Sequence, residues 1–146
     1  MDNEMRLTLV SHSSNESFAR AAVAAFAAQL DPTVEELADL KTAVSEAVTN
    51  CIVHGYRNTI GKIYITTKLQ QDGKETVRVR DKGCGIADIA QAMEPLFTTG
   101  GEERAGLGFA VMENFTDRLR VSSAPGRGTT VTLIKALSLR PANRQS

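Results

Sequence analysis

The sequence predicts an α+β domain with two layers, in which helices cover one face of a mixed or antiparallel sheet. The expected order of elements is strand, helix, helix, hairpin, short helix, loop, helix and hairpin, so helices and hairpins are segregated. Helical stretches repeat apolar residues at spacings of three and four, whereas strand stretches alternate them. A chain of 146 residues without internal repeats or linkers is long enough for one domain with a substantial core.

Composition narrows the class of protein further. Hydrophobic residues make up 42% and charged residues 23% of the chain, which is typical of a soluble domain. Seventeen acidic residues balance seventeen basic ones, so no overall positive field indicates nucleic acid as a partner. We find no apolar run of membrane-spanning length and no secretory leader. Cys51 and Cys84 lack the spacing of zinc ligands, and we expect reduced thiols in a cytoplasmic protein.

The first two predicted elements are a strand and a helix. Residues 5–11 alternate apolar and polar side chains, which is typical of a half-buried strand. Residues 13–16 match a capping box and predict that a helix begins there. Its expected apolar stripe consists of Phe18, Ala22, Phe26 and Leu30. Arg20 lies off this stripe, and we expect it to be exposed.

A second capping box at residues 33–36 opens a second helix, which should end near Gly55. Its buried stripe is formed by Leu37, Leu40, Val44, Ala47, Val48 and Cys51. Glu46, Asn50 and His54 are spaced four apart, so they should stack along one side of this helix.

The second half of the chain contains two predicted hairpins. Residues 63–69 and 76–80 form the first around a turn at 71–73, and residues 119–123 and 129–134 form the second. Between them we expect a short helix at 89–93, a mobile polar segment at 94–105 and a helix that opens at Gly106. The domain therefore covers residues 1–136, and residues 137–146 form a disordered tail.

Glu46 and Asn50 form the first candidate site. The amide oxygen of Asn50 can hold a hard cation such as Mg²⁺. The carboxylate of Glu46 can orient and deprotonate a hydroxyl group beside it. The alternative is a solvated helix face, where such pairs are common.

The second candidate site is Asp81-Lys82-Gly83-Cys84-Gly85, which follows a strand directly. Glycines two apart allow a sharp turn and the close approach of a flat ligand. The aspartate can accept a hydrogen bond from an exocyclic amine such as that of adenine. The alternative is a simple turn, because Asp-x-Gly is common turn chemistry.

The third candidate site is Gly106-Leu107-Gly108, where bare amides at a helix N-terminus can receive phosphate oxygens. Thr98 and Thr99 precede it and can donate hydroxyl groups to a phosphate; helix packing and a solvated loop are the alternatives. Thr129-Thr130 would place one hydroxyl inward, although β-propensity alone explains both. The P-loop motif and the protein-kinase motifs are absent.

The order of these motifs resembles a known superfamily. Glu46-x-x-x-Asn50-x-x-x-His54, then Asp81-x-Gly83-x-Gly85-Ile86, then Gly106-x-Gly108 are similar to the N, G1 and G2 boxes of the GHKL ATP-binding superfamily of gyrase, Hsp90, histidine kinases and MutL. Over nearly the whole chain, including residues 15–20 and 95–99, the sequence looks most like the anti-sigma serine kinases of sporulation.

The resemblance implies a Bergerat-type ATP-binding fold and a set of roles. Glu46 would be the general base for a substrate serine, Asn50 would ligate Mg²⁺, and Arg104 would lie near the γ-phosphate. Arg20 would belong to the partner-binding surface. The residues that would bind ATP or ADP are Asn50, Asp81, Gly83, Gly85, Ile86, Thr98, Thr99, Gly106, Leu107, Gly108 and Thr130, and residues 95–108 would form a lid. Segment 100–104 looks slightly shorter than in the family, which leaves the alignment of Arg104 open.

The resemblance also implies partners: a sigma factor that the protein inhibits, an anti-anti-sigma factor that it phosphorylates on serine, and a second copy in a homodimer. Three alternatives stay open. The protein could be a general-stress anti-sigma kinase, a non-catalytic module that ATP gates, or a detached catalytic domain of a histidine kinase.

Overall fold

The computed structural model describes residues 2–85 and 101–137, and it describes their side chains except those of residues 101–107. Its strands are β1 (Asn3–Val10), β2 (Lys62–Leu69), β3 (Lys74–Arg80), β4 (Arg118–Ala124) and β5 (Gly128–Ala136). Its helices are α1 (Ser14–Ala27), α2 (Val34–Asn50) and α4 (Gly101–Asn114), with a short 3₁₀ turn, η1 (Ala28–Leu30), and a π-helical turn, η2 (Cys51–Gly55).

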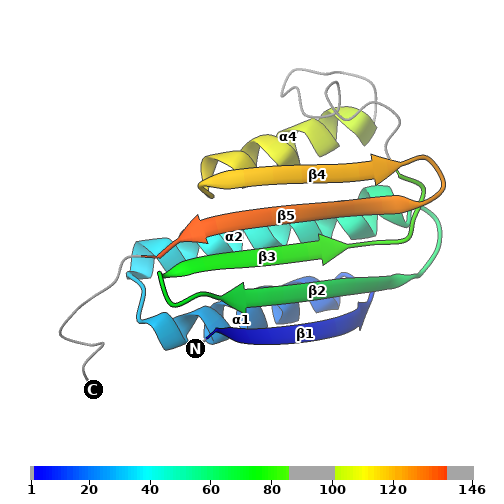
Figure 1. The fold of residues 1–146 in the computed structure, drawn as a ribbon. Coiled ribbons are helices and arrows are strands. Elements are labelled where there is room, and N and C mark those ends of the chain that lie inside the picture. The colour runs from blue at the N-terminus through cyan, green and yellow to red at the C-terminus, as the bar shows by residue number, and fades with distance from the viewer. Residues whose placement is uncertain (1, 86–100, 138–146) are drawn as a thin grey trace.

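The strands form one antiparallel sheet in the order β1-β2-β3-β5-β4, and the helices cover one face of it (Figure 1). This confirms the predicted two-layer α+β class and selects the antiparallel alternative. Both hairpins form where the sequence predicts them. The described residues contain no helix that is both long enough and apolar enough to cross a bilayer.

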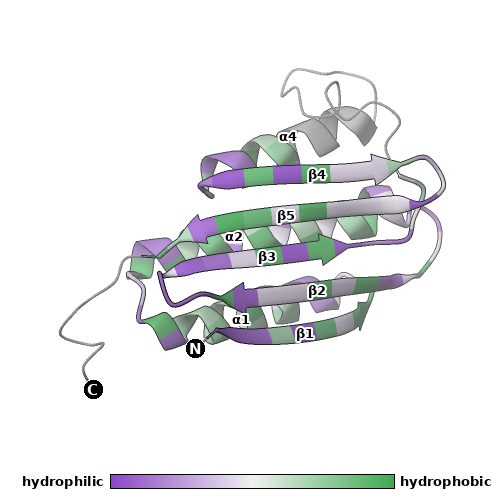
Figure 2. Cartoon of the chain, in the orientation of Figure 1, coloured by the Kyte–Doolittle hydropathy of each residue, from purple (hydrophilic) through white to green (hydrophobic). Residues whose placement is uncertain are grey.

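The core lies between the helices and the inner face of the sheet. Alternate residues of β2, β3 and β5, such as Ile63, Val77 and Val131, are buried there. Apolar and polar residues alternate along β4 in the same way (Figure 2). The predicted inward residues of β1, which are Met5, Leu7 and Leu9, pack against the edge of this core. Because the period of a strand is two, the opposite side chains of each strand face away from the helices.

Helix α1 buries a different face from the one predicted. Phe18 is 53% exposed, and the buried residues are Ala19, Val23, Ala24 and Ala27. The small side chains of this face allow α1 to pack closely against α2, which a phenylalanine would prevent. The predicted capping box of this helix is also wrong, because the Ser13 side chain makes no capping hydrogen bond.

Helix α2 confirms both its predicted cap and its predicted stripe. Thr33 accepts a hydrogen bond from the backbone N–H of Glu36 at 3.0 Å, and the Glu36 carboxylate accepts one from the N–H of Thr33 at 2.8 Å. The helical path continues as predicted to Gly55, but its last turn is the π-helical turn η2. Gly55 has no positive φ, so a left-handed helix cap is not the reason for this glycine.

Helix α4 begins at Gly101, five residues before the predicted start at Gly106. Residues 101–105, which we expected in a mobile loop, therefore form its first turn. Two physical reasons favour the earlier start. The acidic residues at 102 and 103 suit the positive end of the helix dipole, and alanine and arginine favour the helix that follows. The predicted short helix at 89–93, the segment 94–100 and the tail beyond residue 137 lie outside the described residues.

Candidate functional site

The loop after β3 holds the side chain of Asp81 in a fixed position. Only 1% of this residue is exposed. One carboxylate oxygen, Oδ1, accepts hydrogen bonds from the backbone N–H of Gly83 at 2.9 Å and from that of Thr129 at 3.3 Å. A Cβ atom on Gly55 would stand 2.8 Å from the other oxygen, Oδ2. Three segments distant in sequence therefore meet at this carboxylate.

The two glycines of the loop are required by close approaches between backbone segments. A Cβ atom on Gly83 would lie 2.0 Å from the carbonyl oxygen of Gly55. Gly85 has a φ of +75°, and a Cβ atom there would lie 2.0 Å from the carbonyl oxygen of Ala124. The predicted spacing is thus structurally necessary, because it lets η2, the loop and the β4–β5 turn touch one another.

Burial and nearby hydrogen-bond donors have opposite effects on the pKa of the Asp81 carboxyl. Burial raises the pKa of the Asp81 carboxyl, and the N–H of Gly83, the Cys51 thiol and the N–H of Thr129 oppose this rise. Burial also raises the pKa of Cys51 well above its ordinary value, so this thiol stays protonated and can donate to Asp81. A buried carboxylate of this kind is suited to accept a further N–H from a ligand.

Asn50 lies at the end of α2 and is the second element of the site. It is 6% exposed, and its side-chain oxygen Oδ1 has no hydrogen-bond partner within the described part of the chain. A buried acceptor without a partner is costly, and a bound cation would satisfy it. Within the described part of the chain, no group of three or more His, Cys, Asp or Glu side chains could hold a metal ion by itself. Asn50 therefore fits a Mg²⁺ ion with few protein ligands, as is usual when phosphates supply the rest.

Glu46 lies one helical turn before Asn50, next to α4. A Cβ atom on Gly108 would stand 3.3 Å from Oε2 of Glu46, so the fold brings these two predicted site residues together. His54, the third residue of the predicted stack, lies in the π-helical turn η2, where the α-helical spacing ends.

Gly106, Leu107 and Gly108 lie inside α4, beyond its first turn. This corrects the prediction that they open the helix, because the amides that lack helical partners belong to the residues that start at Gly101. The structure also places Arg104 on α4, within the part whose side chains are not described. Ile86, Thr98 and Thr99 lie outside the described residues.

Arg20 and Glu46 line the same cleft of about 480 Å³ between α1 and α2. Arg20 is half-buried rather than exposed as predicted. Its guanidinium lies 3.6 Å from Glu16 and donates to the hydroxyl of Ser45 at 3.4 Å. The other lining residues are Ala38, Lys41, Thr42 and Ser45. The predicted base and the predicted partner residue therefore face one shared space.

Of the two threonines, Thr129 is the one whose side chain lies inward, and its backbone N–H donates to Asp81. Thr129 is buried, and its hydroxyl lies 2.8 Å from that of Ser123. Thr130 lines the open groove on the outer face of the sheet and, together with Asp81, a smaller hollow beside it, and its contact with a nucleotide stays a prediction. The sequence contained the signal, because Thr129 has the same parity as the buried Val131 and Leu133.

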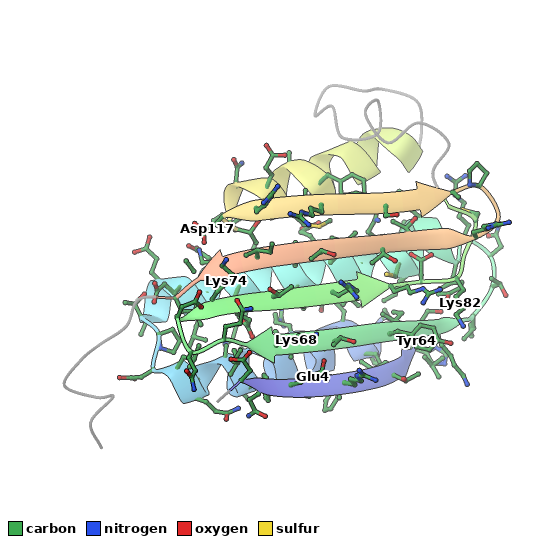
Figure 3. All side chains as sticks on the ribbon, in the orientation of Figure 1. Glu4, Tyr64, Lys68, Lys74, Lys82 and Asp117 are labelled. Carbon is green, nitrogen blue, oxygen red and sulfur yellow. The ribbon has the colours of Figure 1, made fainter. Side chains whose placement is uncertain are left out.

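Tyr56 supports the loop and was missed by the sequence analysis. Its hydroxyl donates to the carbonyl oxygen of Lys62 at 2.6 Å and accepts from the N–H of Lys82 at 2.7 Å. The ammonium of Lys82 lies 4.9 Å from the centre of the Tyr64 ring (Figure 3). These contacts depend on the tertiary fold, so no local pattern predicts them.

Comparison with known proteins matches this geometry to a family. Residues 12–135 match the histidine kinase-like ATPase domain. The chain is 61% identical over 134 residues to the anti-sigma F factor of Thermoanaerobacter sp. (strain X514), covering 91% of this chain and 93% of that protein. It is 54% identical over 140 residues to the anti-sigma F factor of Bacillus subtilis (strain 168), covering 94% and 95%.

A solved structure has the same fold. The crystal structure of the RsbU and RsbW domains of Rv1364c from Mycobacterium tuberculosis superimposes with a TM-score of 0.70 at 25% identity. The match covers 94% of this chain, which spans about a third (32%) of the length of that one.

Proposed function

This chain belongs to the histidine kinase-like ATPase domain family and, within it, to the anti-sigma F factors, and on that premise we propose that it inhibits a sporulation sigma factor. We further propose that it is an ATP-dependent serine kinase, which phosphorylates and thereby inactivates the anti-anti-sigma antagonist. The anti-sigma F names of the relatives support the first activity, and the kinase-type ATPase domain supports the second.

In this proposal the nucleotide contacts residues on both sides of the π-helical turn η2. Asp81 would accept a hydrogen bond from the exocyclic amine of adenine, in a loop that Gly83 and Gly85 allow to pack against its neighbours. Asn50, whose amide oxygen has no partner among the described residues, would hold Mg²⁺, which would neutralise phosphate charge. The roles that the resemblance gives to Ile86, Thr98 and Thr99 stay predictions.

The position of Glu46 is the observation that carries the kinase proposal. This carboxylate lies one turn from Asn50 and lines the cleft that also contains Arg20. A serine that enters the cleft can give its hydroxyl proton to Glu46 while its oxygen attacks the γ-phosphorus of ATP; the bond from that phosphorus to the bridging oxygen breaks, and ADP leaves. Arg20, on the far wall, would then contact the partner protein. We also propose a cytoplasmic homodimer, as the family resemblance implies.

The experiment incubates the protein with radiolabelled ATP, Mg²⁺ and a candidate anti-anti-sigma antagonist from the same organism, and then identifies the labelled amino acid. We expect acid-stable phosphoserine on the antagonist. An acid-labile label would indicate histidine-kinase chemistry, and no label together with retained sigma binding would indicate a non-catalytic module. A pull-down of the bound sigma factor separates a sporulation role from a general-stress role.

A further inference from the structure

The face of the sheet opposite the helices carries two kinds of charge arrangement. On its β1–β2 part the charges are paired, since Glu4 lies 3.6 Å from Arg6 and 3.6 Å from Lys68. Figure 3 shows Glu4 and Lys68 on these neighbouring strands. The positive charges of Arg6 and Lys68 are therefore partly compensated by Glu4.

The β3–β5–β4 part of the same face is positive and uncompensated. It forms an open groove of about 650 Å³, lined by Arg78, Arg80, Arg120, Val121, Ser122, Thr130 and Thr132. In the register of the sheet, Thr132 is paired with both Arg78 and Arg120. Among the residues that the structure describes, none of the three arginines has a hydrogen bond or an ion pair. A smaller hollow beside the groove adds Arg127.

We propose that this arginine groove docks an acidic segment of a protein partner. Arginine binds carboxylates through two parallel N–H groups, and the threonine and serine hydroxyls between the arginines can donate to the same oxygens. Arg78 and Arg80 lie two residues apart on β3, which corresponds to about 7 Å. Alternate carboxylates of an extended peptide have the same spacing. The groove thus suits acidic residues at every second position.

Two other occupants fit the groove less well. Nucleic-acid sites usually combine a strongly basic domain with aromatic side chains that stack on bases. This chain has a net charge of zero, and none of the residues that line the groove is aromatic. A second copy across a two-fold axis would place the arginines against themselves, which like-charge repulsion disfavours.

The test measures binding of a fluorescein-labelled decaglutamate peptide by anisotropy at low salt. The variant Arg78→Gln/Arg120→Gln removes two charges from the groove. The matched control, Arg6→Gln/Lys68→Gln, removes two charges from the paired part of the same face. We expect the groove variant to bind roughly tenfold more weakly, and the control to change by less than about twofold. The four substituted side chains are all exposed to solvent, so both variants should fold.

Three results would overturn the proposal. Equal weakening in both variants would mean that only the diffuse charge of the face attracts the peptide. Tighter binding of an oligothymidine of equal charge would assign the groove to nucleic acid. A change of oligomeric state in the groove variant, seen by sedimentation, would assign it to a second copy. The substituted arginines, Arg78 and Arg120, are not among the residues of the proposed nucleotide site, so failure of this test can be distinguished from failure of the proposed kinase function.

Discussion

Replacing Glu46 by glutamine should abolish phosphoryl transfer to the antagonist while ATP binding is retained. Glutamine has the shape of glutamate and keeps the packing against Gly108, but its amide oxygen cannot take a proton from serine. General-base catalysis contributes about 10²–10⁴ to a rate, so we expect a loss of this size. Label transfer in single turnovers gives the rate, and calorimetric titration gives the affinity for ATP.

Glu35 provides the matched control for this experiment. It is an exposed glutamate on the first turn of the same helix, α2. Glu35→Gln removes the same charge from α2 and should leave both the rate and the ATP affinity unchanged. If Glu46→Gln transferred phosphate as fast as the wild type, Glu46 would not be the base.

Glu75→Gln should stabilise the protein at alkaline pH. Glu75 is fully buried on β3; Oε2 accepts a hydrogen bond from the Thr67 hydroxyl at 3.0 Å, and Oε1 has no partner in the described residues. Burial raises its pKa from 4.5 to about 7, and the hydrogen bond from Thr67 opposes this rise. Lys135, on the neighbouring strand, is paired with Asp39 at 3.3 Å.

The sign of the effect follows from proton binding. The folded protein holds the Glu75 proton more tightly than the unfolded chain, so the stabilising contribution is complete below pH 4.5 and is lost as the pH rises to about 7. The shift corresponds to at most about 3 kcal/mol. Glutamine is neutral throughout, so this loss should be absent from the variant. Urea unfolding at pH 5 and pH 8, with the exposed Glu113→Gln as control, measures the difference. Parallel pH profiles for wild type and variant would contradict a proton on Glu75.

The parts of the fold that the sequence predicts are those that local chemistry determines. The capping box at Thr33 and the stripe of α2 need no tertiary information, and neither do the alternating strands. Helix α1 offered two apolar stripes, and only packing against α2 selects the one with Ala19 and Val23. The start of α4 was mispredicted because the pair Gly100-Gly101 suggested a loop, whereas the residues that follow favour a helix.

In the candidate site too, some features follow from the local sequence and others depend on segments that are distant in sequence. The spacing of Asp81, Gly83 and Gly85 predicts a tight loop, but the reason for each glycine lies in segments far away in sequence. The contribution of Cys51 to Asp81 depends on the end of α2 reaching the end of β3, which no local pattern reveals. Which of the two threonines, Thr129 or Thr130, has its hydroxyl inward could, in contrast, have been predicted from strand parity alone.

The relative affinity of the wild-type protein for ATP and for inosine triphosphate tests the central claim most directly. Inosine carries a carbonyl oxygen where adenine carries its amine, so it would face the Asp81 carboxylate with an acceptor and leave it unsatisfied. We expect ATP to bind at least about tenfold more tightly, and we expect Asp81→Asn to lose this preference. Equal affinities of the wild-type protein for the two nucleotides would contradict adenine recognition by Asp81.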